Sequence, residues 1–103
     1  MSNTGFIPFK TLAVIGIGLI GGSFLKDVRR LGLSRKIIGY ENNKKHRDII
    51  DSTNIVDYLA SNPDNKLKDA ELVMLAVPVK SFKQVISEIS PFIKKSTILT
   101  DVG

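Results

Sequence analysis

The sequence of 103 residues contains no cysteine, no tryptophan and a single histidine. Without cysteine there is neither a disulfide framework nor a thiolate metal site, and no residues occur at metal-ligand spacing. No apolar run approaches the roughly 18 residues that span a bilayer, and residues 1–10 lack the long apolar stretch of a secretory signal. We therefore expect a cytoplasmic protein with no membrane partner.

Aromatic residues are also scarce, at 7% of the chain, although the net charge is +5. The basic residues occur in small groups, several of them at expected helix ends, where cations offset the helix dipole. No aromatic residues alternate with them, as a stacking platform for bases would require. The charge therefore indicates a solvated surface, and we expect no nucleic-acid partner. The length predicts one domain, residues 1–103.

An apolar run followed by Gly16, Gly18 and Gly21 at G-x-G-x-x-G spacing is the segment that organises the chain. In a dinucleotide site the first glycine permits a tight turn, the second lets the pyrophosphate approach the backbone, and the third lets the helix pack closely on the strand. The helix then directs its N-terminal N–H groups at the pyrophosphate. We expect the N–H groups of Leu19 and Ile20 to bind it.

The context of the motif favours this interpretation over a plain glycine-rich turn. An apolar strand, residues 10–15, precedes the glycines, and an amphipathic helix, residues 19–31, follows them and ends at Gly32. A second strand, residues 36–40, ends at Glu41, twenty residues after the third glycine. At this position an acid is expected to accept the adenosine ribose hydroxyls.

The rest of the chain continues the alternation of strands and helices. We predict a basic helix over residues 43–52, with Asn54 in the left-handed position after it, and then a short edge strand at Ile55 and Val56. We further predict one helical turn over residues 66–69, a strand over residues 71–77, a helix over residues 82–90 that Pro91 ends with a short extra turn, and a strand over residues 97–100. This pattern predicts the α/β class, with right-handed crossovers between parallel strands.

The expected fold is a Rossmann-type doubly wound parallel sheet, in the strand order 3-2-1-4-5, within a three-layer αβα arrangement. Its switch point lies between strands one and four, above their carboxyl ends, where ligands bind. The glycine turn and the segment Ala76, Val77 and Pro78 both reach that place.

Four segments at matching spacing resemble the nucleotide-binding half of the prephenate and arogenate dehydrogenases: residues 14–23, 38–41, 75–79 and 100–103. The first is the most specific, because Gly-Leu-Ile-Gly-Gly-Ser is typical of this family. The resemblance covers residues 11–103. It implies oxidative decarboxylation of prephenate or arogenate in tyrosine biosynthesis, with hydride transfer to a nicotinamide dinucleotide.

The sequence departs from the family at the end of the second strand. The family usually has aspartate where this chain has Glu41, and often arginine where it has Asn42. Glutamate can still accept from both ribose hydroxyls, and a carboxylate repels a 2′-phosphate, so we expect NAD. Lys44, Lys45 or Arg47 could instead approach that phosphate, which leaves NADP open.

In the family the Asp-Val-Gly motif is followed by a serine and, later, by catalytic histidine and arginine residues. A mostly helical domain, which binds substrate and forms the homodimer, also follows it. This sequence ends at that motif. We therefore expect a fragment without catalytic residues that binds cofactor but does not turn over substrate alone, and its own oligomeric state is open. Two alternatives also stay open: another NAD(P)-dependent oxidoreductase, of the 3-hydroxyacid dehydrogenase or pyrroline-carboxylate reductase type, and a non-catalytic nucleotide-binding or redox-sensing module.

Three further positions have two interpretations each. Asp101 and Gly103 end the last strand, either lining the nicotinamide site or forming a plain strand end. The helical spacing of Phe82 favours the core over a place beside adenosine. His46, on the basic helix, is expected to be a solvated surface residue. The expected cofactor-binding residues are Gly16, Gly18, Leu19, Ile20, Gly21, Glu41, Asn42, Ala76, Val77, Pro78 and Asp101.

Overall fold

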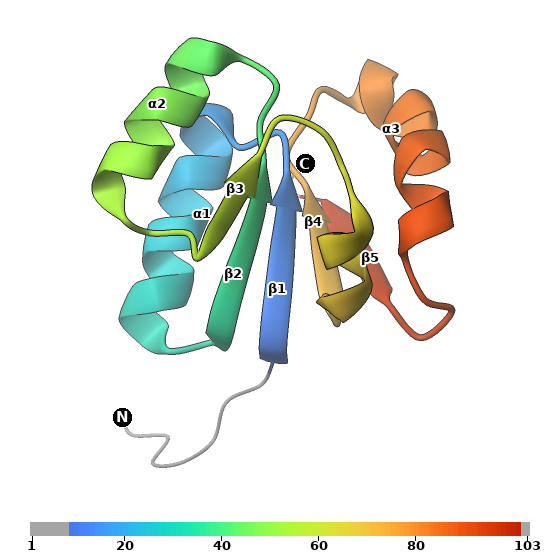
Figure 1. The fold of residues 1–103 in the computed structure, drawn as a ribbon, viewed down its shortest axis with the longest axis horizontal. Helices are drawn as coiled ribbons and strands as arrows, with labels where there is room; N and C mark the ends of the chain where they lie inside the picture. The colour runs from blue at the N-terminus through green and yellow to red at the C-terminus, as the bar shows by residue number, and fades with distance from the viewer. Residues whose placement is uncertain (1–8, 102–103) are drawn as a thin grey trace.

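Five parallel strands form one sheet within residues 9–101, the residues that the computed structural model describes (Figure 1). The strands are β1 (Phe9–Ile15), β2 (Ser34–Tyr40), β3 (Tyr58–Ala60), β4 (Leu72–Leu75) and β5 (Ile98–Asp101). The helices are α1 (Gly18–Leu31), α2 (Lys44–Thr53) and α3 (Phe82–Ile89), with 3-10 helices η1 (Asn65–Asp69), η2 (Val79–Ser81) and η3 (Ser90–Phe92).

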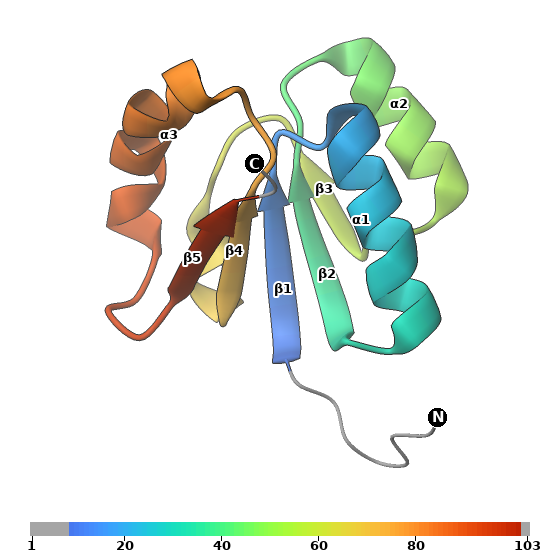
Figure 2. The same cartoon turned by 180° about the vertical axis from the view of Figure 1, so that it is seen from behind.

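The strand order is β3-β2-β1-β4-β5 and every strand pair is parallel, which confirms the predicted Rossmann-type topology. β1 lies between β2 and β4, so it is buried on both faces, as its continuous apolar run predicts. Figures 1 and 2 show α1 and α2 together on one side of the sheet and α3 on the other. The helices therefore form the outer layers of the expected αβα arrangement.

Each face of the sheet has its own apolar cluster. Leu25 and Val28 of α1 and Ile50 of α2 pack on one face, while Leu67 of η1 and Ile89 of α3 pack on the other. Burial of each large aliphatic side chain contributes about 1.5–3 kcal/mol to the stability of the fold. The two clusters hold the sheet between its helices and so fix the relative positions of the strand ends.

The predicted ends of two helices are confirmed. Gly32 adopts the left-handed conformation (φ 65°) after α1, and its N–H donates to carbonyls of the last turn. Asn54 does the same after α2 (φ 57°). Pro91 lies in η3 directly after α3, and the predicted helical turn at residues 66–69 lies within η1.

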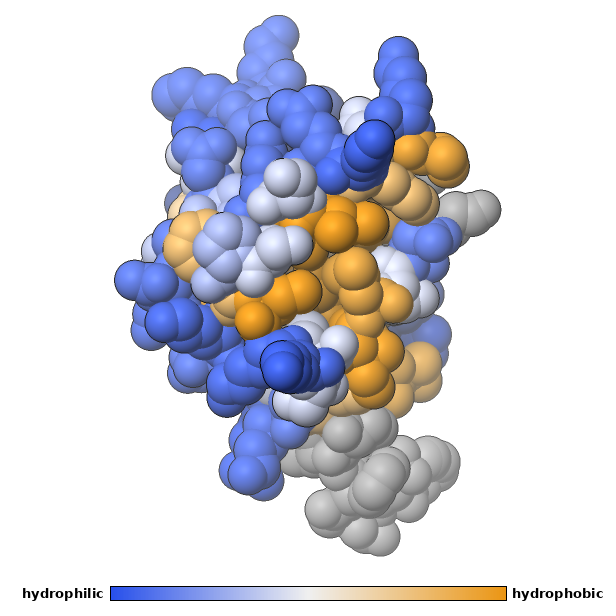
Figure 3. Space-filling view, turned by 90° about the vertical axis from the view of Figure 1, so that its right-hand side faces the viewer, coloured by the Kyte–Doolittle hydropathy of each residue, from blue (hydrophilic) through white to orange (hydrophobic). Residues whose placement is uncertain are grey.

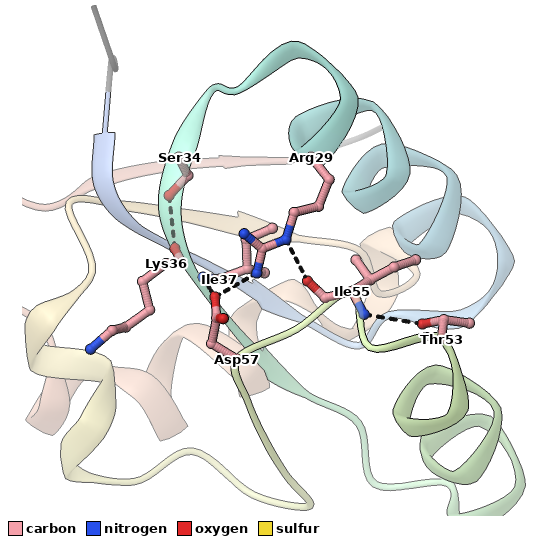
Figure 4. Close-up of polar contacts among 7 residues, drawn as sticks. All are labelled: Arg29, Ser34, Lys36, Ile37, Thr53, Ile55 and Asp57. Carbon is pink, nitrogen blue, oxygen red and sulfur yellow. Dashed lines mark hydrogen bonds and ion pairs between the residues drawn. The ribbon is translucent and has the colours of Figure 1, made fainter. Parts of the chain in front are cut away.

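The predicted third strand at Ile55 and Val56 is wrong, because β3 begins at Tyr58. Figure 4 shows the reason: the Arg29 Nε donates to the Ile55 carbonyl (2.8 Å), so that carbonyl belongs to a contact with α1 rather than to a sheet ladder. Ile55 and Val56 instead pack against the cluster beneath α1 and α2. Their β-branched, apolar character reflects this packing, which a pattern of two residues does not distinguish from a strand.

β5 forms one edge of the sheet and is largely exposed. Figure 3, which faces the side carrying α3 and β5, shows apolar side chains gathered on that surface within a hydrophilic frame. The exposed large apolar residues of this region are Val79, Ile86, Ile98 and Leu99. None of the helices within residues 9–101 has the length and apolar character that crossing a bilayer requires.

Candidate functional site

A cleft of about 410 Å³ opens at the carboxyl ends of β1 and β4, where the sheet reverses its direction of winding. Its walls come from the glycine turn, the end of β2, the start of α2, the segment after β4, and α3. Its lining includes seven of the predicted cofactor-binding residues: Gly16, Gly18, Glu41, Asn42, Ala76, Val77 and Pro78. The topology thus brings together residues that are far apart in the chain.

Gly16 makes the turn between β1 and α1, where a larger residue would be strained and would push against its neighbours. Its φ is +74°, and a Cβ atom there would lie 2.3 Å from Cγ1 of Val77. Its N–H donates to the carbonyl of Tyr40 (2.7 Å), which holds the turn against the end of β2. The first glycine therefore has the geometry that the motif predicts.

Gly18 begins α1 and faces open space. Its φ is +48°, and a Cβ atom there would meet no described atom within 4 Å. In contrast, a Cβ atom on Gly21 would lie 3.2 Å from Cβ of Ala76 and 3.3 Å from Cγ2 of Ile17. The second glycine thus leaves room above the first helical turn, and the third brings the helix close to the end of the central strands.

The first turn of α1 presents its backbone N–H groups at this place. Leu19 and Ile20 lie in that turn, which contains no acidic residue of its own. A helix N-terminus carries a partial positive charge, which favours an anionic group beside it. Glu41, directly after β2, lies beside this turn, and its Oε1 accepts a hydrogen bond from the Gly18 N–H (3.1 Å).

Glu41 is only 6% exposed, and backbone groups hold its carboxylate on both sides. Oε1 accepts from the Gly18 N–H, and Oε2 accepts from the Asn43 N–H (3.0 Å). A buried carboxylate needs such partners, because burying a charge without hydrogen bonds is costly. Two oxygens together offer about four acceptor positions. After these two bonds the carboxylate still has acceptor positions left.

His46 lies on the same wall of the cleft, which the sequence did not predict. Its side chain is 52% exposed, in agreement with the prediction of a solvated residue, but Nδ1 lies 3.8 Å from Oε2 of Glu41. Asn43 caps α2 by accepting from the His46 N–H (3.1 Å). This cap fixes where α2 begins and so places His46 beside Glu41. An asparagine two residues after the acid was the sequence signal for it.

The basic residues considered for a 2′-phosphate do not line the cleft. Lys44 pairs with Asp48 (2.8 Å) on the exposed side of α2. The Arg47 Nη1 donates to the backbone carbonyl of Glu41 (3.0 Å), so it fixes the turn rather than facing the carboxylate. Neither they nor Lys45 are among the cleft-lining residues of the described chain.

The opposite wall consists of α3 and the turn before it. Ser81, Gln84, Val85 and Glu88 line the cleft, and Gln84 Nε2 donates to Glu88 (3.2 Å). The sequence pattern places Gln84 and Glu88 on the polar side of this helix and Val85 on its apolar side, and it did not predict that they line a cleft. The spacing of four between Gln84 and Glu88 does put both on one face. Phe82 packs against the core cluster beneath α3, which confirms its predicted place in the core.

A partly buried polar cluster lies at the end of β2, where Tyr40 borders a smaller hollow beside the cleft. Asp64 accepts hydrogen bonds from the hydroxyls of Tyr40 (2.7 Å) and Tyr58, and from the Lys66 N–H (3.0 Å). Burial opposes ionisation of Asp64, but these hydrogen bonds outweigh it and lower the pKa of the carboxyl. Burial, and then the bond to Asp64, raises the pKa of Tyr40 far above its usual range.

This cluster positions the segment between β3 and η1. Ser61, Asn62 and Pro63 border a smaller hollow of about 90 Å³, which shares several residues with the cleft, including Asn42 and Glu88. The hollow therefore extends the cleft past the end of β2.

Two of the predicted residues lie at the last strand. Asp101 ends β5 beside Leu75 of β4 and is not among the cleft-lining residues within the described chain. Gly103 lies outside the described residues. The nicotinamide contacts expected of this strand thus stay a prediction.

A second hollow, of about 200 Å³, lies between α1 and α2 and is mostly apolar. Leu25, Ile49 and Ile55 contribute to its lining. It shares Gly18 with the polar cleft but contains no acid. The two hollows therefore suit ligands of different chemistry.

Comparison with known proteins gives consistent matches over most of the chain. The family model described as prephenate dehydrogenase, nucleotide-binding domain, matches residues 24–103. The chain is 30% identical over 95 residues to the cyclohexadienyl dehydrogenase of Zymomonas mobilis. The matched region covers 92% of this chain and 32% of that protein.

Solved structures give the same picture. A prephenate dehydrogenase from A. aeolicus, in complex with hydroxyphenyl propionate and NAD+, superposes with a TM-score of 0.81 at 28% identity, over 89% of this chain and 32% of that one. The arogenate dehydrogenase of Synechocystis superposes with a TM-score of 0.79 at 26% identity, over 90% and 32%. The chain spans about a third of the length of these relatives. It belongs to the family of prephenate dehydrogenase nucleotide-binding domains.

Proposed function

We propose that this domain binds NAD in the cleft at the carboxyl ends of β1 and β4. The observation that carries the proposal is the buried Glu41 carboxylate, held by the Gly18 N–H at the start of α1. A fixed acceptor for a ribose diol thus lies directly beside a helix N-terminus suited to pyrophosphate. The A. aeolicus relative, which was solved with NAD+, supports the choice of this cofactor.

Each part of the site has a proposed task. The N–H groups of Leu19 and Ile20 donate to the pyrophosphate, for which Gly18 leaves space. The Glu41 carboxylate accepts from the 2′- and 3′-hydroxyls of the adenosine ribose, with Asn42 beside the adenine. Ala76, Val77, Pro78 and Asp101 are proposed to lie along the path toward the nicotinamide, which supplies the hydride acceptor.

We further propose that the longer protein is a prephenate or arogenate dehydrogenase. The support is the family match and the names of relatives that are about three times as long. Substrate binding and homodimer formation are proposed for that longer protein. The family match also favours this reaction over those of the 3-hydroxyacid dehydrogenase and pyrroline-carboxylate reductase types.

Calorimetric titration with NAD tests the proposed cofactor site. In Gly18→Ala, the new methyl group points into the space above the first helical turn. We expect NAD affinity to fall at least about tenfold, equivalent to about 1.4 kcal/mol. Gly22→Ala is the matched control, because its methyl group also meets no described atom within 4 Å, but one turn further along α1.

The control variant should bind NAD as the unmodified chain does. Thermal melting must accompany the titration, because a left-handed alanine costs about 1–2 kcal/mol of stability. Equal NAD affinity in the unmodified chain and in folded Gly18→Ala, or no NAD binding by the unmodified chain, contradicts the proposed site.

A further inference from the structure

Three titratable side chains line the cleft within the described residues: Glu41, His46 and Glu88. Glu88 belongs to α3 on the opposite wall and accepts from Gln84. Glu41 and His46 lie together on the wall formed by the end of β2 and the start of α2, with 3.8 Å between Oε2 and Nδ1. His46 is thus the group of this set that can carry a positive charge.

Glu41 cannot turn away from a ligand at this wall. Its carboxylate is buried and accepts from two backbone N–H groups that belong to different segments, those of Gly18 and Asn43. Moving it would leave both N–H groups without that partner, at a cost comparable to a lost hydrogen bond for each. Its negative charge therefore stays where the ribose is proposed to bind.

His46 is held equally well at its backbone but keeps a half-exposed ring. Its N–H donates to the capping oxygen of Asn43, so the first turn of α2 fixes its position. The neighbouring cations are directed elsewhere: Lys44 pairs with Asp48, and Arg47 donates to the carbonyl of Glu41. Histidine is the side chain that ordinarily changes its charge between pH 5 and 8.

We propose that His46 is the specificity-determining residue for the 2′ position of the bound dinucleotide, and that its protonation admits NADP. With neutral His46, the Glu41 carboxylate repels a 2′-phosphate and accepts a 2′-hydroxyl, which selects NAD. With His46 protonated, a cation lies beside the carboxylate and within reach of the phosphate, so the repulsion is offset. This inference rests on the proposed function of the cleft.

The pH dependence has a definite sign. NADP binds more tightly when His46 is protonated, while the uncharged ribose hydroxyls of NAD gain little from the added cation. Glu88 lies across the cleft and is the same in every variant compared, so it does not account for a difference between them. The ratio of the two dissociation constants, NADP to NAD, should therefore fall as the pH falls.

The test measures both dissociation constants by calorimetry at about pH 8 and about pH 5.5, on either side of the usual histidine range, at one ionic strength. For the unmodified chain we expect the ratio of NADP to NAD dissociation constants to fall about tenfold between these pH values. His46→Gln stays neutral and should keep a high ratio, which changes only as far as protonation of the 2′-phosphate changes it. His46→Lys stays positive and should keep a low ratio at both.

The 2′-phosphate itself has a second pKa near 6, as in other phosphate monoesters. Any change of the ratio with pH in His46→Gln measures this contribution. Lys45→Gln is the control for loss of a nearby cation, because Lys45 does not line the cleft, and it should retain the pH dependence of the unmodified chain. Thermal melts at both pH values confirm that each variant is folded.

The possible outcomes separate the two claims. If the unmodified chain binds neither dinucleotide, the proposed function fails and the inference fails with it. If NAD binds but the ratio does not change with pH, the inference is overturned while the NAD site stands. The same conclusion follows if His46→Gln shows the full pH dependence.

Discussion

Glu41 shows how one buried side chain connects the parts of the cleft. Its carboxylate joins the start of α1 to the start of α2, through the N–H groups of Gly18 and Asn43. Its backbone is also fixed, because its N–H donates to Ala60 and its carbonyl accepts from Arg47. The residue that we propose for ribose recognition thus also organises the loop around it.

Glu41→Ser tests the role of this carboxylate in cofactor choice. Two like charges about 4 Å apart repel by about 4 kcal/mol at an effective dielectric of 20. With partial screening we expect the unmodified chain to prefer NAD over NADP by roughly tenfold to a few hundredfold near pH 8, or about 1.4–3 kcal/mol. The serine variant should lose most of that preference, because it removes both the repulsion and the ribose acceptor.

The measurement is the pair of dissociation constants for NAD and NADP, with melting curves to verify folding. Glu71→Ser is a suitable control, because Glu71 is exposed and accepts from the Lys10 N–H before β4, away from the cleft. Tighter binding of NADP than of NAD by the unmodified chain near pH 8 would show that basic residues, and not Glu41, control the site.

The cluster of Tyr40, Tyr58 and Asp64 gives the fold a dependence on pH. The pKa of Asp64 is lowered in the folded chain. Its carboxylate therefore stabilises the fold at pH values above the unfolded pKa near 3.9, and this stabilisation is lost as the pH falls through the folded pKa. The pKa of Tyr40 is raised, so its contribution is complete below about pH 10 and is lost as the pH rises further. Stability should therefore fall at both ends of the pH range.

Tyr40→Phe separates the alkaline part of this dependence. At neutral pH the variant should be less stable by about 1.5–3 kcal/mol, the usual contribution of a hydrogen bond to a charged group. Between about pH 7 and pH 10.5 it should lose less stability than the unmodified chain, because phenylalanine has no proton to release. Urea unfolding at both pH values measures this, and an equal loss in the two proteins would exclude Tyr40 as the cause.

At the residue scale, local spacing in the sequence predicts some of the residues that line the cleft. The roles of Gly16 and Glu41 follow from the motif and from the count of residues after it, and both line the cleft. His46 and Glu88 were not foreseen, because their place depends on how α2 and α3 begin. A helix start that shifts by one residue turns each side chain by about 100°, since a turn takes 3.6 residues.

At the scale of elements, Asp57 holds the connection from α2 to β3 through both its backbone and its side chain. Its N–H donates to the Ile37 carbonyl (2.8 Å). Asp57 accepts from the Ile37 N–H (2.8 Å) and from the Arg29 guanidinium (2.6 Å), as Figure 4 shows. The sequence predicted the glycine and asparagine helix ends, which depend on local chemistry. It misplaced β3 because this arrangement depends on residues of three different elements.

Asp57→Ala should destabilise the fold by about 1–3 kcal/mol, mainly because the buried Ile37 N–H loses its acceptor. The ion pair with Arg29 should contribute less than about 1 kcal/mol, since both side chains are partly exposed. Asp27→Ala is the control, because Asp27 pairs with Arg30 on the exposed face of α1, and its cost should be within about 0.5 kcal/mol. Urea unfolding gives both values, and equal losses would contradict the assigned role of the Ile37 contact.

At the scale of the whole molecule, the topology places two hollows around the start of α1. The polar cleft lies above the ends of β1 and β4. The second, mostly apolar hollow lies between α1 and α2 and is called the groove below. The sequence predicted the sheet order and therefore the cleft, because alternating elements and right-handed crossovers leave few topologies. The groove was not foreseen, since it depends on how two helices pack side by side.

A two-dimensional NMR spectrum of the labelled chain shows which backbone amides respond to NAD and so locates the binding site. We expect NAD to shift the amide resonances of residues 16–21, 41–46 and 76–85. Amides of the groove wall, at Ile49, Thr53 and Ile55, should stay unchanged. Shifts confined to that groove wall, or no shifts at the glycine turn and Glu41, would contradict a dinucleotide site in the cleft.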